Sequence, residues 1–197
     1  MLYSVKKKGL WCATCRPGSK FYLMSKKEEE KVYKQLLTVK DDTFLTIDRE
    51  VHTSFSCITA GTGKKFARLD FVIELPTHRV VLEVDERQHK DTSYNVLCDV
   101  SRMLDVMSMM CMRNDRKTRW IRFNPNAFEK DRVVQRVSPG RRYEALLQTI
   151  QRSPSMNNDM ELVYMYYDVD KNDDLLLFRD PDYHAQVKSL VTQVVIR

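Results

Sequence analysis

The sequence contains little glycine, little proline and no long apolar run, and each shortage excludes a class of protein. With only 5 glycines and 6 prolines in 197 residues, no long flexible linker is expected. No stretch approaches the roughly 18 apolar residues that a membrane-spanning helix needs, so we expect no membrane partner. The lysines of residues 1–8 precede only a brief apolar patch, which is not the pattern of a signal peptide.

Cysteine is sparse as well. The 5 cysteines form an odd set without the spacing of a disulfide framework, which favours a reducing compartment. We therefore expect an intracellular protein, cytoplasmic or nuclear. Cys12 and Cys15 have the spacing of half a zinc site, but no second pair of ligands follows. Residues 1–24 are interpreted as an N-terminal arm, with a zinc-module remnant left open, and residues 25–197 as the main domain.

Positive charge exceeds negative charge, with 33 lysines and arginines against 27 acids and a net charge of +6. Basic side chains gain affinity for phosphates by releasing counterions, so the surplus is compatible with a nucleic-acid partner. We expect DNA and leave RNA open. The basic patches 113–119 and 132–142 are either walls of a nucleic-acid cleft or solvated loops.

Hydrophobic periodicity predicts an α/β fold with a mixed sheet. Methionines recur on one face of the predicted helix 92–112, which indicates core filling. The other expected helices begin after Ser25 and span 143–151 and 183–195. The expected strands lie within 44–55 and at 68–75, 79–86 and 119–123, with a hairpin of 162–167 and 175–178. The acidic turn 168–174 lacks the glycine and glutamate of a calcium-binding loop.

The hairpin around Pro76-Thr77 carries most of the chemistry. If the turn is centred there, residues whose numbers sum to 153 face each other, and Asp70 lies opposite Glu83. Alternation along the strand then places Asp85 on the same face as Glu83. Val80, Leu82 and Val84 occupy the other face, which is expected to be buried. Three carboxylates are therefore predicted to converge at one end of the hairpin.

Such a group of acids is costly without a cation, because like charges that face each other on paired strands repel. Carboxylate oxygens with several waters are the ligands that magnesium or manganese prefers. We therefore expect Mg²⁺ or Mn²⁺ at Asp70, Glu83 and Asp85, where it would activate a water and stabilise charge on a phosphodiester. The alternative is that the acids lie on a solvated edge without function.

Gln88, His89 and Lys90 follow the acidic strand directly. A histidine at this position is suited to ligating a metal, to proton transfer or to donating to a phosphate. A surface histidine without function is the alternative.

The motifs Arg68-Leu-Asp-Phe71 and Leu82-Glu-Val-Asp-Glu-Arg-Gln-His89 resemble the PD-(D/E)XK, or restriction-endonuclease-like, superfamily. The branch that looks most similar contains very-short-patch-repair endonucleases and EDxHD homing endonucleases. Similar hairpins occur in proteins of large DNA viruses and algae, which makes a viral origin one expectation. The resemblance covers roughly 27–128 and implies a restriction-endonuclease-like three-layer sandwich with a mixed central β-sheet.

The resemblance also implies roles for individual residues. Asp70 would be the first metal ligand and Glu83 the second, while Asp85 stands where many relatives have a lysine. His89 would take over from that lysine, as a histidine does in the repair-endonuclease branch. Glu50 matches an upstream glutamate of many relatives, and Gln88 would orient a water or a carboxylate.

The basic residues near these motifs are predicted to meet the nucleic acid. Arg68, Lys90, Arg102 and Arg122 are the candidates. Arg102 and Arg122 would face phosphates or brace the acids, and the alternative is that they only form ion pairs in the core. The function that follows is a metal-dependent endonuclease acting on DNA. The alternatives are a nuclease fold that binds nucleic acid or assembles without catalysis, and a purely structural interaction protein. The sequence leaves open whether the protein forms a homodimer.

Overall fold

The computed structural model describes residues 2–5, 9–12, 26–54, 66–89, 96–113, 116–154, 160–179, 181–187 and 191–195. The chain divides into two compact units, Met1–Thr38 and Val39–Arg197. The first unit contains an antiparallel pair, β1 (Leu2–Val5) and β2 (Gly9–Cys12), and the helix α2 (Lys27–Leu37).

Helix α2 has the charge pattern of a stable helix start. Glu28, Glu29 and Glu30 occupy its first turn, where negative charge is favoured by the helix dipole. Val32 and Leu36 are buried at helical spacing, together with Glu29. The helix begins after Lys26, and Ser25, the predicted cap, lies outside the described residues.

The second unit is built on a mixed six-stranded sheet with the order β10-β9-β6-β5-β4-β3. Its strands are β3 (Thr46–Ser54), β4 (Phe66–Glu74), β5 (Arg79–Val84), β6 (Thr118–Phe123), β9 (Met160–Met165) and β10 (Val191–Val195). The strands β3, β4 and β5 are antiparallel to one another, whereas β5, β6, β9 and β10 run parallel. The expected α/β class with a mixed sheet is confirmed.

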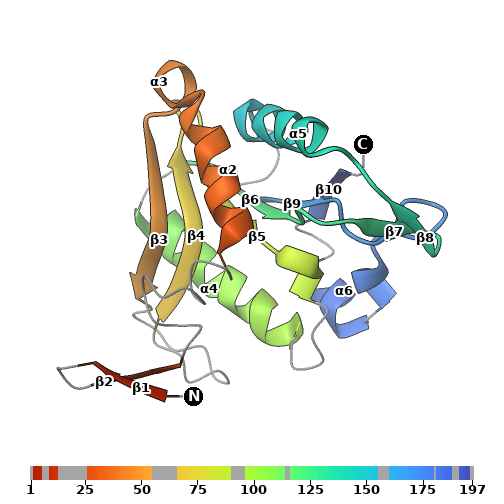
Figure 1. Ribbon diagram of the computed structural model, residues 1–197, viewed down its shortest axis with the longest axis horizontal. Coiled ribbons are helices and arrows are strands. Elements are labelled where there is room, and N and C mark those ends of the chain that lie inside the picture. Colours follow the sequence, from red (N-terminus) through yellow and green to blue (C-terminus); the bar gives the residue numbers. More distant parts are fainter. Residues whose placement is uncertain are drawn as a thin grey trace. The chain divides into compact units, whose positions relative to one another are not determined.

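Helices cover both faces of this sheet (Figure 1). Helix α4 (Val96–Arg113) packs Met103, Val106 and other buried residues against Trp120 of β6, and Val187 of α6 (Pro181–Val187) joins the same cluster. Helix α5 (Pro139–Gln151) covers the opposite face, which carries Arg119, the neighbour of Trp120. Alternation along the strands thus separates two helical layers.

The methionines of α4 fill the core as expected, because Met103, Met107 and Met110 are all buried. Among the helices in the described ranges, none is long and apolar enough to cross a membrane. Shorter elements complete the unit. They are α3 (Lys40–Thr43) and two 3-10 helices, η1 (Glu86–His89) and η2 (Leu176–Arg179).

A hairpin that the sequence did not predict follows β6. Strands β7 (Phe128–Lys130) and β8 (Val133–Gln135) pair across Asp131 and Arg132. Both turn residues have positive φ, 49° and 66°, as a two-residue type I′ turn requires. Three-residue strands leave too short an alternation to recognise in a sequence.

The C-terminal part differs from two predictions. The expected strand 175–178 is the 3-10 helix η2, with only an isolated bridge between Val169 and Leu175. The expected helix 183–195 ends at Val187, and 191–195 form β10 beside β9. Parallel pairing brings together segments distant in the sequence, so local periodicity did not reveal this strand.

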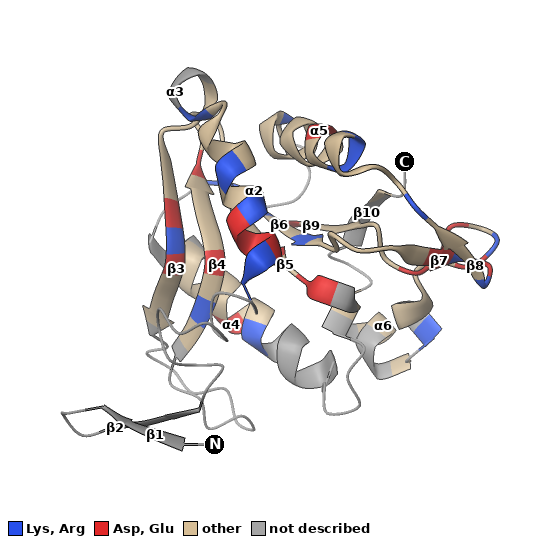
Figure 2. Ribbon diagram, viewed as in Figure 1, with Lys and Arg blue, Asp and Glu red and all other residues tan. Residues whose placement is uncertain are grey.

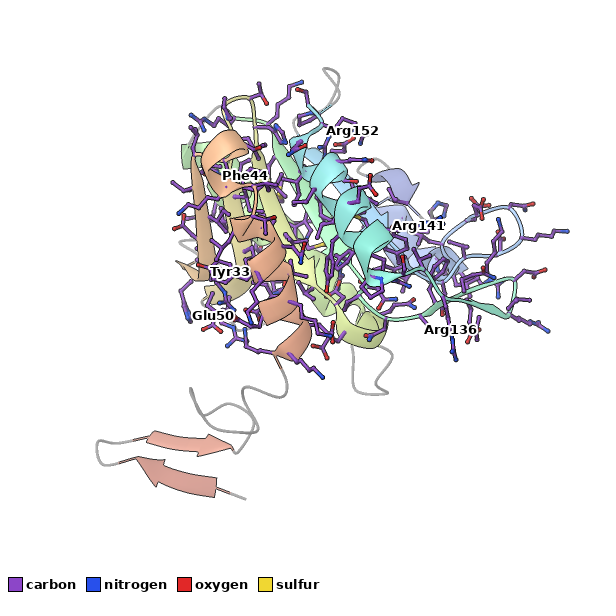
Figure 3. All side chains as sticks on the ribbon, turned by 45° about the horizontal axis from the view of Figure 1, so that its top comes forward. Tyr33, Phe44, Glu50, Arg136, Arg141 and Arg152 are labelled. Carbon is purple, nitrogen blue, oxygen red and sulfur yellow. The ribbon has the colours of Figure 1, made fainter. Side chains whose placement is uncertain are left out.

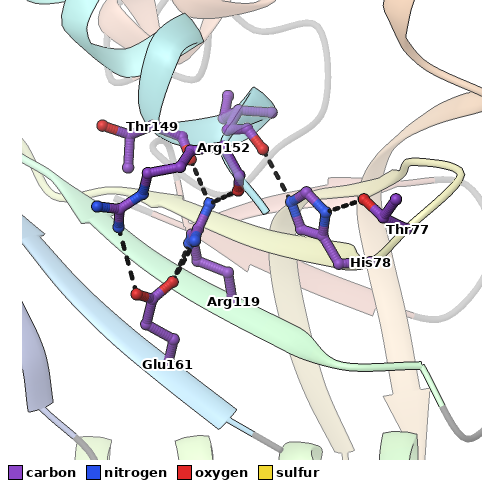
Figure 4. A network of polar contacts seen from close by, with 7 residues as sticks. Thr77, His78, Arg119, Thr149, Arg152 and Glu161 are labelled. Atoms are coloured by element: carbon purple, nitrogen blue, oxygen red, sulfur yellow. Dashed lines mark hydrogen bonds and ion pairs between the residues drawn. The ribbon is translucent and has the colours of Figure 1, made fainter. Parts of the chain in front are cut away.

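Beneath α5, a buried polar network joins the sheet to the end of the helix (Figure 4). The guanidinium of Arg119 forms an ion pair with Glu161 and donates to the carbonyl groups of Thr149 and Arg152. His78 Nε2 lies 2.9 Å from the carbonyl oxygen of Ile150 and therefore donates to it, while Nδ1 accepts from the Thr77 hydroxyl at 2.9 Å. Carbonyl groups that a helix leaves unpaired at its C-terminus thus find donors in the sheet.

Burial lowers the pKa of His78, with the charge of Arg119 acting in the same direction, so the neutral ring is the folded form. Protonation below the ordinary pKa of 6.5 then favours the unfolded chain. We expect His78→Gln to reduce the loss of unfolding free energy between pH 7 and pH 5, because the variant has no group to protonate at this position. Urea unfolding at both pH values measures this, and an unchanged pH dependence in the variant contradicts it.

Candidate acidic centre

The predicted register of the central hairpin is present in the structure. Phe71 pairs with Leu82 and Glu74 with Arg79, so the numbers of facing residues sum to 153 as expected. The turn closes where predicted, with the Leu75 amide donating to the His78 carbonyl at 2.9 Å. The paired register ends at Phe71 and Leu82, and Asp70 and Glu83 are the residues next to this last pair.

Asp70 and Glu83 lie together at the end of β5. The Oδ2 atom of Asp70 accepts a hydrogen bond from the backbone amide of Val84 at 2.9 Å, which holds the carboxylate against the last residue of that strand. Glu83 is only 5% exposed, and the charges of Asp70 and Asp85 both act on its carboxyl group. The three predicted acids are therefore electrostatically coupled, and we call them the acidic centre.

Glu83 is an incompletely paired carboxyl group of the acidic centre. Its Oε2 atom lies 3.4 Å from Nη2 of Arg102 on α4, whereas Oε1 is buried without a hydrogen-bond partner. Burial raises the pKa of Glu83 to about 8, with Asp70 and Asp85 adding to the rise and Arg102 opposing it. At neutral pH this carboxyl group therefore holds a proton that a cation could replace.

Two neighbours engage one carboxylate oxygen of Asp85. Its Oδ2 atom accepts one hydrogen bond from Nε of Arg122 at 2.6 Å and another from the hydroxyl of Tyr167. Arg122 lies beside Glu83 in the parallel register of β5 and β6, and its guanidinium stacks 6.0 Å from the ring centroid of Tyr164. Asp85 and Arg122 are both buried. This buried ion pair is compatible both with bracing the acids and with pairing in the core.

Gln88 links the turn after the acidic strand to the end of β9. Its Nε2 atom donates to Oδ1 of Asp168 at 2.8 Å, and its Oε1 atom accepts the Asp168 amide at 2.9 Å. The same Oδ1 atom accepts the amide of Glu129 at 2.7 Å, which adds strand β7 to the junction. Gln88 has a φ of 58°, and this reciprocal pair of hydrogen bonds supports the unfavourable backbone conformation.

Glu50 shows the other unusual backbone conformation near the centre. It lies within β3 between the pairs Arg49–Phe71 and Val51–Leu69, at the position that faces Asp70, and its φ is 49°. A positive φ in a strand costs about 1–3 kcal/mol for a residue other than glycine. The register thus brings Glu50 to the strand segment that carries the first predicted ligand.

The remaining predicted basic residues fall into two groups. Arg102 holds Glu83 as described and also donates from Nη1 to the carbonyl of Arg68 at 3.2 Å, while the side chain of Arg68 is exposed. The side chain of His89, together with Lys90 and Cys15, lies outside the described residues. In the described part of the chain, no three Asp, Glu, His or Cys side chains are grouped so that they alone could hold a metal ion.

Sequence reasoning missed Tyr167 and Asp168. Both follow β9 at the edge where the parallel strands β5, β6 and β9 end. Polar residues at the carboxyl ends of parallel strands are a known signal for a site. The signal was hidden because 162–167 was interpreted as half of a hairpin rather than as a parallel strand.

The arrangement offers a carboxyl group that can exchange a proton for a cation, a second carboxylate near it, and two arginines beside Glu83. This combination suits the binding of a hydrated divalent cation next to a negatively charged substrate. Comparison of the chain with protein-family models, with curated proteins and with solved structures finds no match in any of the three.

The raised pKa of Glu83 makes a prediction about stability. The unfolded chain releases this proton near pH 4.5 and the folded chain near pH 8, so without metal the unfolding free energy falls as pH rises between these values. We expect Glu83→Gln to remove about 1–3 kcal/mol of the fall between pH 5 and pH 8, at about 1.4 kcal/mol per pKa unit. Urea unfolding in a chelator measures the difference.

Glu74→Gln is the matched control, because Glu74 lies at the far end of the same hairpin in ion pairs with Arg79 and Arg116. This control should leave the fall between pH 6 and pH 8 in place. Equal pH dependence in the wild type and in Glu83→Gln would contradict the assignment.

Proposed function

We propose that this protein is a metal-dependent nuclease that hydrolyses phosphodiester bonds in DNA at the acidic centre. The observation that supports this most strongly is Glu83, a buried carboxyl group with an unpartnered oxygen beside Asp70. A protein gains no stability by burying such a group, so its presence is explained best by a ligand that compensates it.

The finer fold is part of the same proposal. A mixed sheet with antiparallel β3, β4 and β5, extended by parallel β6 and β9 and covered on both faces by helices, suits the restriction-endonuclease-like sandwich that the hairpin motifs resemble. The acids lie where the direction of strand pairing changes, between β4 and β6. Crevices at the carboxyl ends of parallel strands are common ligand sites.

The donor set fits magnesium or manganese. Glu83 supplies a buried oxygen without a partner, and Asp70 supplies a second carboxylate, which suffices for an ion that keeps several waters. Asp85 is the weaker candidate, since Arg122 and Tyr167 engage its Oδ2 atom. A bound ion of this kind supplies charge neutralisation and a water of lowered pKa.

The chain's own residues perform the remaining tasks. Arg102 holds Glu83 in place and, because it is partly exposed, presents positive charge beside the acids for a phosphate group. Asp85, which also accepts a hydrogen bond from the Tyr167 hydroxyl, orients Arg122 next to Glu83. Gln88 fixes the turn that leads to His89, for which we propose proton transfer.

The second candidate is a nuclease fold that binds nucleic acid without cleaving it. The engagement of Asp85 by Arg122 favours this alternative, because the usual lysine is absent and Asp85 itself is not available for proton transfer. This candidate predicts DNA binding that depends on salt but not on divalent metal.

Cleavage of supercoiled plasmid in Mg²⁺ or Mn²⁺ tests the proposal. Asp70→Asn and Glu83→Gln should each lower the cleavage rate at least about 100-fold, because each removes a charge from the site that holds the ion. Glu74→Gln, purified in the same way, should cleave within about 3-fold of the wild type. Equal cleavage by all variants would reveal a contaminating nuclease, and no cleavage by any would favour the second candidate.

A further inference from the structure

Three exposed arginines lie in the β7–β8 turn and at the start of α5, and no contact within the described residues gives them a structural role. The segment Arg132–Tyr143 contains four arginines and no acid. Arg132, Arg136 and Arg141 are exposed, and within the described part of the chain none of the three side chains forms an ion pair or hydrogen bond. Arg136 and Arg141 flank the start of the helix in Figure 3, and Figure 2 shows the same positive charge along the chain leading into α5.

The fourth arginine shows what a structural role looks like in this segment. Arg142 is buried, donates from Nη1 to the Asn124 carbonyl at 2.8 Å and from Nε to the Val137 carbonyl at 3.1 Å, and stacks 4.4 Å from the ring centroid of Tyr166. Its three neighbours make no comparable contacts. Their positive charge is therefore available for an external partner.

The surface between these arginines is hollowed. A hollow of about 550 Å³ is lined by Arg136, Val137, Ser138 and Arg141. The side chain of Ser138 makes no capping bond to α5, and the first turn of the helix carries no acid. A Cβ atom at Gly140 would have no atom within 4 Å, so the backbone here is open to a ligand. The hollow thus combines guanidinium groups with an unshielded peptide backbone.

This segment is tied directly to the acidic strand. The amide of Glu129 at the base of the β7–β8 hairpin and Nε2 of Gln88 in η1 both donate to Oδ1 of Asp168. Two further hydrogen bonds hold the hairpin to the loop after β9. The Asp131 amide donates to the Val169 carbonyl at 3.0 Å, and the Val169 amide donates to the Glu129 carbonyl at 2.9 Å. The hairpin and the turn after Asp85 therefore share one anchor and have a defined relative position.

We propose that Arg132, Arg136 and Arg141 form a second nucleic-acid contact, an arginine surface that docks the phosphate backbone away from the acidic centre. Guanidinium groups bind phosphate oxygens through two parallel hydrogen bonds. Because the three arginines are spread over a hairpin and a helix start, they suit successive phosphates of one strand better than a single small anion. The choice of nucleic acid over another polyanion rests on the proposed function.

Binding of a labelled duplex of about 20 base pairs, measured by fluorescence anisotropy in chelator, tests the arginine surface independently of cleavage. The triple variant R132Q/R136Q/R141Q should bind at least about 10-fold more weakly than the full wild-type chain. It should also lower the slope of log affinity against log salt by about 2 to 3, at about 0.9 per lost phosphate contact.

A control variant removes positive charge from the opposite end of the strands. K40Q/K117Q changes two partly exposed lysines, one at the start of α3 and one directly before β6. This control should weaken binding less than about 3-fold, because charges farther than a Debye length from the bound phosphates are screened. A loss per charge in the control equal to that in the triple variant would overturn the arginine surface.

A second pair of variants keeps the test valid if the triple variant does not fold. Since Gly140 has open space, G140A and G140E both fit, and an acid in the first turn favours the helix. G140A should bind DNA like the wild type, and G140E should bind several-fold more weakly at unchanged melting temperature. Equal binding by both would contradict the proposal, as would competition by polyglutamate as effective as that by DNA.

The outcome is separable from that of the nuclease proposal. D70N/E83Q should abolish cleavage yet retain DNA binding in chelator. If the wild type never cleaves but the arginine triple variant still loses affinity and salt dependence, the arginine surface stands and the catalytic proposal fails.

Discussion

The burial of negative charge at the end of β5 is the constraint on which the arrangement of this protein depends. Glu83 and Asp85 lie on the interior of a sheet, where an uncompensated carboxylate costs several kcal/mol. The neighbouring elements compensate the two buried carboxyl groups in different ways. Asp85 is paired with Arg122 and Tyr167, whereas Glu83 lies 3.4 Å from Arg102 and keeps a proton. One oxygen of Glu83 has no hydrogen-bond partner within the described part of the chain.

Two buried arginines elsewhere have closer charge or dipole partners than Glu83 has. Arg119 is paired with Glu161 and with carbonyl groups at the end of α5, and Arg142 with carbonyl groups and the Tyr166 ring. Other buried polar atoms, such as Nη2 of Arg119 and the Tyr164 hydroxyl, also lack a hydrogen-bond partner, but Arg119 keeps its ion pair with Glu161. The incomplete pairing of Glu83 coincides with positive φ at Glu50 and Gln88. Unsatisfied charge and strained backbone occur together where a ligand would compensate both.

Asp168 connects this centre to the outer part of the fold. Its side chain joins η1 to β7, and Tyr167 beside it reaches Asp85, so the loop after β9 positions both the acidic centre and the hairpin with the arginines. Under the proposed function, a phosphate backbone held at the arginine surface would thus have a defined distance to the acids, set by this one short segment.

Local patterns were sufficient for the hairpin of β4 and β5, its register, and the core face of α4, because alternation and helical spacing report burial directly. Those patterns also identified Asp70, Glu83 and Asp85 as neighbours, since a two-residue turn at Pro76-Thr77 leaves one register.

The local patterns did not reveal β10, the β7–β8 hairpin, or the roles of Tyr167 and Asp168. Parallel pairing and contacts between distant loops depend on how the chain closes on itself, and the partners of Asp85 come from segments 37 and 82 residues away. Tertiary packing therefore decided that Asp85 is paired and that Glu83 keeps an unpartnered oxygen, because it sets the dielectric and the donors around each carboxyl group.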